Sequence, residues 1–284
     1  MQMRFSTCRL LACMAVVLAG LPGVAAADEW DSCVKLSDDL AVAGCSRAID
    51  SRQYTGRSLA RLHARRGGAY QAQGDVNRAV ADYNESMRID PTYPSAYLNR
   101  GNVWFHRGDF DRALADYNQA IQLAPDYAVA YANRGSALGS KGDFDRAIAD
   151  FDQAIQLDSK DADAYYGRGR AFGGKGDLDR AMADYDQAIR LNPKYARAYH
   201  NRGSAWGNKG DLDRAIADYD QAIRLDPKEP KAWYHRGIAW EMKRNLKAAL
   251  ADFKMYAQLA PSDRDGLAAV KRVSKELSKM TGRR

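Results

Sequence analysis

The feature of this chain that most restricts its fold is an internal repeat of 34 residues. Six successive segments of this length share one pattern and follow one another without a gap, at residues 60–93, 94–127, 128–161, 162–195, 196–229 and 230–263. A period in this range is typical of supersecondary units that stack on one another to bury a continuous core. The repeat therefore predicts a stacked array of small units.

Each repeat carries two helical patterns separated by a Gly-Asp turn. In the third repeat, the first pattern places Tyr131, Gly135 and Leu138 at positions i, i+4 and i+7 of one helix face. Gly142 can adopt the left-handed conformation that ends a helix, and Asp143 can cap the helix that follows. We therefore predict two antiparallel helices in each repeat.

The spacing of aromatic and small residues resembles that of the tetratricopeptide repeat. In the fifth repeat the family's pattern appears as Tyr199, Gly203, Trp206, Ala215, Tyr219, Ala222 and Pro227. The resemblance covers residues 60–263 and implies an all-α fold, an α-solenoid in which stacked helix hairpins form a right-handed superhelix. The sixth repeat departs from the pattern, because Arg244-Asn245 replaces Gly-Asp.

Two charged positions differ from the family consensus in every repeat. The seventh position is arginine where the tetratricopeptide consensus has leucine, and the twenty-third is aspartate where it has tyrosine. Because a buried guanidinium without a partner is costly, we predict structural ion pairs inside the helix stack. The pairs are Arg66 with Asp82, Arg100 with Asp116, Arg134 with Asp150, Arg168 with Asp184, Arg202 with Asp218, and Arg236 with Asp252. The alternative interpretation is an arginine row that binds an anionic ligand.

The N-terminal residues have the layout of an export signal. Arg4 and Arg9 precede an apolar run, residues 10–21, and small residues follow it up to Asp28. This order predicts a cleaved secretory signal peptide at residues 1–27 and a periplasmic or secreted protein. A lipobox ending at Cys13 is the alternative, although it would precede most of the apolar run.

Residues 28–59 are predicted to form a divergent N-terminal helix pair. Loss of the signal peptide would leave two cysteines, Cys33 and Cys45, and an even number in an exported chain favours a disulfide. Two buried thiols are the alternative.

Residues 264–284 are predicted to form a C-terminal capping helix and a basic tail. Ser262 and Asp265 are expected to cap this helix, and Leu267, Val270 and Leu277 are expected to face inward.

Charge and motif content argue against several function classes. The formal net charge is +7, and basic and acidic residues are interleaved, unlike a nucleic-acid interface. Gly169–Lys175 has the GxxxxGK spacing of a phosphate-binding loop but lacks the Ser or Thr that should follow. No catalytic constellation or zinc-ligand spacing is present, so we predict a non-enzyme without metal or cofactor.

The family resemblance implies that the first helix of each repeat lines an inner groove. The candidate ligand-binding residues at groove positions are Arg61, Arg65, Asn99, Asn102, Asn133, Ser136, Tyr166, Arg170, Arg197, His200, Asn201, Ser204, Lys231 and Tyr234. Asn99, Asn133 and Asn201 resemble an asparagine ladder that grips a peptide backbone. We predict a protein–protein interaction scaffold that binds a segment of a partner polypeptide. The alternatives are an accessory subunit of a cell-envelope enzyme complex, related to peptidoglycan or polysaccharide, and use of the opposite, convex face.

Overall fold

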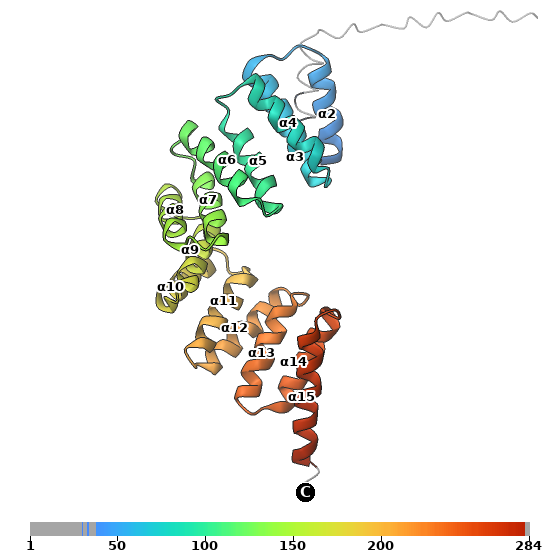
Figure 1. Ribbon diagram of the computed structural model, residues 1–284, viewed down its shortest axis with the longest axis vertical. Helices are drawn as coiled ribbons and strands as arrows, with labels where there is room; N and C mark the ends of the chain where they lie inside the picture. Colours follow the sequence, from blue (N-terminus) through green and yellow to red (C-terminus); the bar gives the residue numbers. More distant parts are fainter. Residues whose placement is uncertain (1–29, 31–32, 34–37, 282–284) are drawn as a thin grey trace, which may run out of the picture. The chain divides into compact units, whose positions relative to one another are not determined.

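The computed structural model describes Trp30, Cys33 and residues 38–281, and in this part of the chain the secondary structure is helical, without strands. Two compact units divide at Asp90 and Pro91 (Figure 1). The N-terminal unit contains α2 (Asp38–Asp50), α3 (Gly56–Ala72) and α4 (Val76–Ile89). The C-terminal unit contains α5 (Pro94–His106), α6 (Phe110–Leu123), α7 (Ala128–Ser140), α8 (Phe144–Leu157), α9 (Ala162–Gly174), α10 (Leu178–Leu191), α11 (Ala196–Asn208), α12 (Leu212–Leu225), α13 (Pro230–Met242), α14 (Leu246–Leu259) and α15 (Arg264–Thr281). The predicted signal peptide lies outside the described residues.

Successive helices of the C-terminal unit pack as hairpins, one for each of repeats two to six. The first and second helices of a repeat contact each other, as α7 and α8 do, and each second helix also contacts the first helix of the next repeat. Contacts are therefore made mainly between neighbours in the sequence. This arrangement is the all-α solenoid that the repeat predicts.

The turn inside each hairpin has the predicted chemistry. Gly142 has a φ of +83°, and the Asp143 carboxylate accepts a hydrogen bond of 3.4 Å from the backbone N–H of Arg146. In the sixth repeat Arg244 occupies the glycine position with a φ of +60°, and Asn245 caps α14. The turn survives there, although a non-glycine residue must adopt a left-handed conformation.

The glycine after each repeated arginine explains how closely the two helices of a hairpin approach. A Cβ atom on Gly101 would lie 2.6 Å from the ring of Tyr117, which follows Asp116 on the second helix. The Arg-Gly pair on the first helix therefore faces an Asp-aromatic pair on the second. The arginine bonds to the aspartate, and the aromatic ring packs against the glycine next to that arginine.

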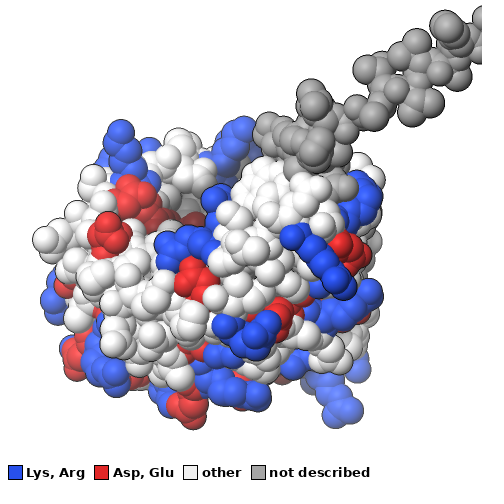
Figure 2. Space-filling model, turned by 90° about the horizontal axis from the view of Figure 1, so that it is seen from above, with Lys and Arg blue, Asp and Glu red and all other residues white. Residues whose placement is uncertain are grey.

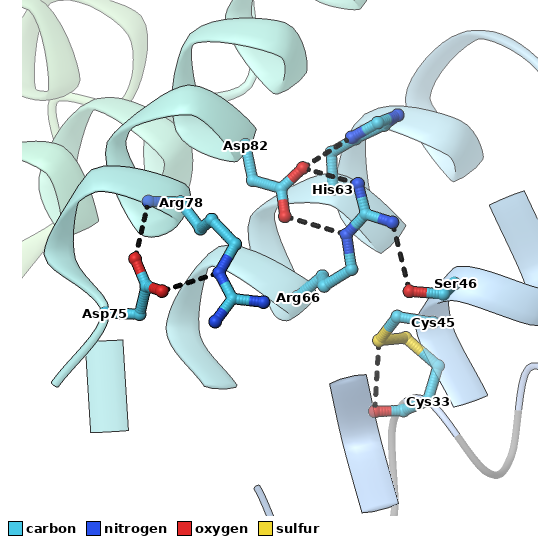
Figure 3. Close-up of polar contacts among 8 residues, drawn as sticks. All are labelled: Cys33, Cys45, Ser46, His63, Arg66, Asp75, Arg78 and Asp82. Carbon is cyan, nitrogen blue, oxygen red and sulfur yellow. Dashed lines mark hydrogen bonds and ion pairs between the residues drawn. A yellow bond between two sulfur atoms is a disulfide. The ribbon is translucent and has the colours of Figure 1, made fainter. Parts of the chain in front are cut away.

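The N-terminal unit differs in two ways from the regular repeats. Its α3 begins at Gly56, earlier than the predicted repeat boundary at residue 60. The Sγ atoms of Cys33 and Cys45 are joined at 2.02 Å (Figure 3). Both cysteines pack with Leu62 in a small apolar cluster. Most of the helix predicted before α2 lies outside the described residues.

The last helix, α15, covers the end of the array, but the predicted details were partly wrong. Val270 and Leu277 pack toward the core around α14, whereas Leu267 is 50% exposed. The fully inward positions are Ala269 and Val273. The N-terminal cap is Asp263, whose carboxylate accepts the backbone N–H of Asp265 at 2.8 Å; neither Ser262 nor Asp265 caps the helix.

Basic and acidic side chains alternate on the molecular surface. Figure 2 shows lysines and arginines interspersed with aspartates and glutamates on the face viewed. Many form exposed ion pairs between neighbouring repeats, as Lys141 does with Asp111. Every helix within residues 38–281 is too short or too polar to span a bilayer.

Candidate functional site

The repeated arginines are held by carboxylates of the second helices. Arg134 donates from Nε to Asp150 Oδ2 at 2.8 Å and from Nη2 to Oδ1 at 2.7 Å. Its Nη1 donates to Asn118 Oδ1, in the preceding repeat, at 2.8 Å. The hydrogen bonds to Asp150 raise the pKa of Arg134 above its ordinary value. One guanidinium group therefore ties together the second helices of two successive repeats.

The same geometry recurs along the C-terminal unit. The two-sided contacts are Arg168 with Asp184 and Asp152, Arg202 with Asp218 and Asp186, and Arg236 with Asp252 and Asp220; Arg100 pairs with Asp116. In Arg134, Arg168, Arg202 and Arg236 all three guanidinium nitrogens donate to acceptors of the protein, which leaves little of these groups for a ligand. The geometry favours the structural interpretation over the anion-binding one.

Sequence reasoning missed the second acceptor of these arginines. It is the twenty-fifth residue of the preceding repeat, which is Asn or Asp in five of the six repeats. That regularity was visible in the sequence. Its role depends on the distance between successive second helices, which a repeat pattern does not provide.

The first arginine of the series belongs to a larger cluster in the N-terminal unit (Figure 3). Arg66 donates to both oxygens of Asp82 at 2.8 Å and to Ser46 Oγ at 3.1 Å. His63 Nδ1 lies 3.0 Å from Asp82 Oδ1. Burial by itself would raise the pKa of Asp82, but the hydrogen bonds from Arg66 and His63 lower it below its ordinary value. This cluster connects α2, α3 and α4.

The two candidate groove residues of the N-terminal unit contact the segment before α2. The guanidinium group of Arg61 lies 5.2 Å from the ring centroid of Trp30, and Arg65 Nε donates to the Cys33 carbonyl at 3.3 Å. Both arginines therefore contact described residues that precede α2, Trp30 and Cys33.

The candidate residues of repeats two and three bond mainly to one another. Asn102 Oδ1 accepts from Asn133 Nδ2 at 2.8 Å and from the Tyr117 hydroxyl at 2.9 Å. Ser136 Oγ donates to a backbone carbonyl of its own helix. Asn99 is half-buried and has no such bond among the described residues. The asparagine ladder is thus partly satisfied within the protein.

Six predicted residues come together in repeats four to six. They line a cavity of about 440 Å³, here called the α9–α13 pocket, together with parts of α12 and the turn before α13. The lining residues are Tyr166, Arg170, Ala196, Arg197, His200, Asn201, Ala222, Asp226, Glu229, Lys231 and Ala232. Asp226 and Glu229 were not predicted, because they belong to the turn between repeats and not to a first helix.

A chain of hydrogen bonds joins three lining residues of this pocket to His235. Asn201 Nδ2 donates to the Tyr166 hydroxyl at 3.1 Å, and Asn201 Oδ1 lies 3.1 Å from His200 Nδ1. His200 Nε2 lies 2.8 Å from His235 Nδ1, and the two rings are stacked with centroids 5.0 Å apart. The bond requires one ring to donate and the other to accept, so the pair is compatible with two neutral imidazoles.

Burial acts on all three titratable groups of this chain of hydrogen bonds. It lowers the pKa of His235 to about 4 and lowers that of His200 below its ordinary value. It also raises the pKa of the Tyr166 hydroxyl. At neutral pH these three groups are therefore polar but uncharged.

The two remaining candidates lie outside this pocket. Ser204 Oγ donates to the His200 carbonyl and accepts from the Tyr219 hydroxyl at 3.2 Å. The ring of Tyr234 packs against Phe253 and Tyr256. Both side chains contribute to helix packing.

Metal-site geometry is absent among the described residues, where histidine, cysteine and carboxylate side chains do not gather in groups of three that could hold a metal ion. The GxxxxGK segment forms the end of α9, and its Lys175 pairs with Asp145.

Comparisons with known sequences agree with the helix-hairpin geometry. Models of the tetratricopeptide repeat match residues 133–196, 166–230, 202–273 and 94–127, and a TPR repeat model matches residues 67–106. No curated protein sequence matches the chain.

Several solved structures share the fold. The structure of the APC/C hetero-tetramer Cut9-Hcn1 has a TM-score of 0.72 and 18% identity, and covers 82% of this chain; the match spans 48% of that chain, about half of its length. PilW, a widely conserved type IV pilus biogenesis factor, has a TM-score of 0.69 and 18% identity, and the match covers 76% of this chain and 98% of PilW. YrrB, described as a TPR protein with an unusual peptide-binding site, has a TM-score of 0.52 and 24% identity, and the match covers 66% of this chain and 97% of YrrB.

Proposed function

Since this chain belongs to the tetratricopeptide repeat family, we propose that it is a non-catalytic scaffold that binds a segment of a partner polypeptide against its first helices. The observation that carries this proposal is the α9–α13 pocket, because six residues at the family's ligand-facing positions meet there. YrrB, which shares the fold, has a peptide-binding site, and this also supports the proposal.

We also propose that the protein works in an exported compartment. The support is the signal-like order of residues 1–27 in the sequence and the Cys33–Cys45 disulfide geometry, which suits an oxidising environment. An accessory subunit of a cell-envelope enzyme complex is the second candidate function. In that role the protein would bind a folded enzyme, and a short peptide would not replace it.

Binding to fragments of a captured partner separates these two functions. The full chain would be used to isolate partners from an envelope extract, and each partner would then be divided into overlapping peptides of about 20 residues. A scaffold of the proposed kind should retain most of its affinity for one such peptide in isothermal titration. An accessory subunit should bind only the intact folded partner.

Matched amide substitutions test which face is used. Asn99→Ala with Asn201→Ala removes two carboxamides from first helices, and Gln119→Ala with Gln221→Ala removes two from second helices. A net contribution of about 0.5–1.5 kcal/mol per hydrogen bond predicts roughly tenfold weaker binding for the first pair and little change for the second. The reverse result would place the site on the second helices.

A further inference from the structure

The α9–α13 pocket contains three cations that form no ion pair among the described residues. Arg170, Arg197 and Lys231 are exposed, and among the described residues none of them has a carboxylate within ion-pair distance. By contrast, Lys175 and Lys209, on the turns of the same repeats, each pair with an aspartate of the preceding repeat. The three pocket cations are therefore available to a ligand.

The two acids of the pocket are held by backbone hydrogen bonds. Asp226 accepts the N–H of Lys228 at 3.1 Å, and Glu229 accepts the N–H of Lys231 at 3.2 Å. These bonds keep both carboxylates on the turn between α12 and α13, whereas Arg170 comes from α9 and Arg197 from α11. Three cations and two carboxylates leave one net positive charge, which suits a singly charged carboxylate better than a phosphate group of nearly two charges.

The neutral part of the pocket suits a peptide backbone. Tyr166 and Asn201 supply hydrogen-bonding groups without charge, and the guanidinium of Arg170 lies 6.0 Å from the ring centroid of Tyr166. A planar guanidinium can donate two parallel hydrogen bonds to a carboxylate. The pocket therefore has groups that can bind a carboxylate next to groups that can bind a peptide backbone.

We propose that the α9–α13 pocket selects acidic partner segments, with an aspartate or glutamate carboxylate bound between Arg170 and Arg197. The cavity of about 440 Å³ has room for a few residues of such a segment. This inference rests on the proposed scaffold function and adds the chemistry of the partner. Lys231 contributes long-range attraction, which salt should weaken.

A selection experiment with a matched control tests the assignment. The full chain is presented with a phage library of random linear dodecapeptides, beside two variants that each lose two positive charges. Arg170→Gln with Arg197→Gln changes the pocket, whereas Arg190→Gln with Arg224→Gln changes exposed arginines on the second helices of the same repeats. Affinities of selected peptides, and of counterparts with Gln or Asn in place of Glu or Asp, are then measured by fluorescence anisotropy.

The inference expects peptides enriched in Asp and Glu. Their binding should weaken about tenfold in the pocket variant, less than about twofold in the control variant, and about tenfold when the acids become amides. Acidic peptides that bind the pocket variant equally well would overturn the site but leave the scaffold function intact. Peptides without acidic enrichment would overturn the partner chemistry, as would displacement of a bound peptide by inorganic phosphate at submillimolar concentration. If the full chain enriches no peptide, the scaffold function itself fails.

Discussion

Breaking one arginine–aspartate pair tests whether these charges hold the repeats together. Arg134→Met removes the guanidinium group and leaves the Asp150 carboxylate, whose side chain is only 9% exposed, without its ion-pair partner. Removing one partner of a buried pair typically costs about 3–5 kcal/mol. Because the Arg134 side chain is itself 23% exposed, water can reach the site, so we expect about 3 kcal/mol.

A double variant tests whether the loss comes from leaving one charge of the pair without its partner. Arg134→Met with Asp150→Leu leaves no buried charge, and apolar replacement of a buried pair is often neutral, so the loss should be about 1 kcal/mol or less. Lys141→Met is the matched control, since it breaks an exposed pair with Asp111 in the same region and should cost less than about 1 kcal/mol.

Hydrogen exchange measured by mass spectrometry is the suitable assay, because a repeat array does not unfold as a single two-state unit. A local loss of about 3 kcal/mol corresponds to roughly 100-fold faster exchange, which we expect in α7, in α8 and in the neighbouring α6. If the double variant loses as much as the two single variants together, Arg134 and Asp150 do not stabilise the fold as a pair.

Three further perturbations have expected outcomes. Protein purified under oxidising conditions should contain the Cys33–Cys45 bond, and its reduction should destabilise the N-terminal unit by about 3 kcal/mol; free thiols in the intact mass would contradict this. Arg244→Gly should stabilise the sixth repeat by about 1 kcal/mol in thermal unfolding, because glycine relieves the left-handed φ of +60°; an unchanged or lower stability would argue against strain at this turn. Burial favours neutral His200 and His235, so the folded state binds fewer protons than the unfolded state below pH about 6.5, and stability should fall as the pH decreases toward 4. We expect the free energy of unfolding to fall by about 2 kcal/mol from pH 6.5 to 5, and His235→Gln should reduce this loss. A pH-independent stability would show that the two rings are not held in the neutral form by burial.

The regular part of the fold could be predicted because each repeat has the same local signals. Gly142 and Asp143 mark a helix end and a helix start through backbone conformation and capping, which depend only on nearby residues. The exact position of helix ends was less predictable. Leu267 illustrates the reason: helical periodicity gives a face, but the neighbouring helix decides which residues of that face are covered.

The candidate site was predictable only in part. Arg170 and Arg197 were assigned from their repeat positions, and the pocket contains both. Asn102 and Asn133 were also assigned from their repeat positions, yet they bond to each other, because their carboxamides come within hydrogen-bond distance across two helices. Repeat position therefore identified which residues could face a ligand, but not which of them already had partners.

By itself, the sequence determined the repeat length, the helix hairpins and the pairing of each arginine with an aspartate sixteen residues later. These features follow from local propensity and from a period that is the same in all six repeats. Only the tertiary structure decided that Arg134 also reaches Asn118, that His200 contacts His235, and that the cations of α9, α11 and α13 meet at one pocket. The physical reason is that such contacts depend on the spacing and rotation of neighbouring hairpins, which result from the packing of many side chains at once.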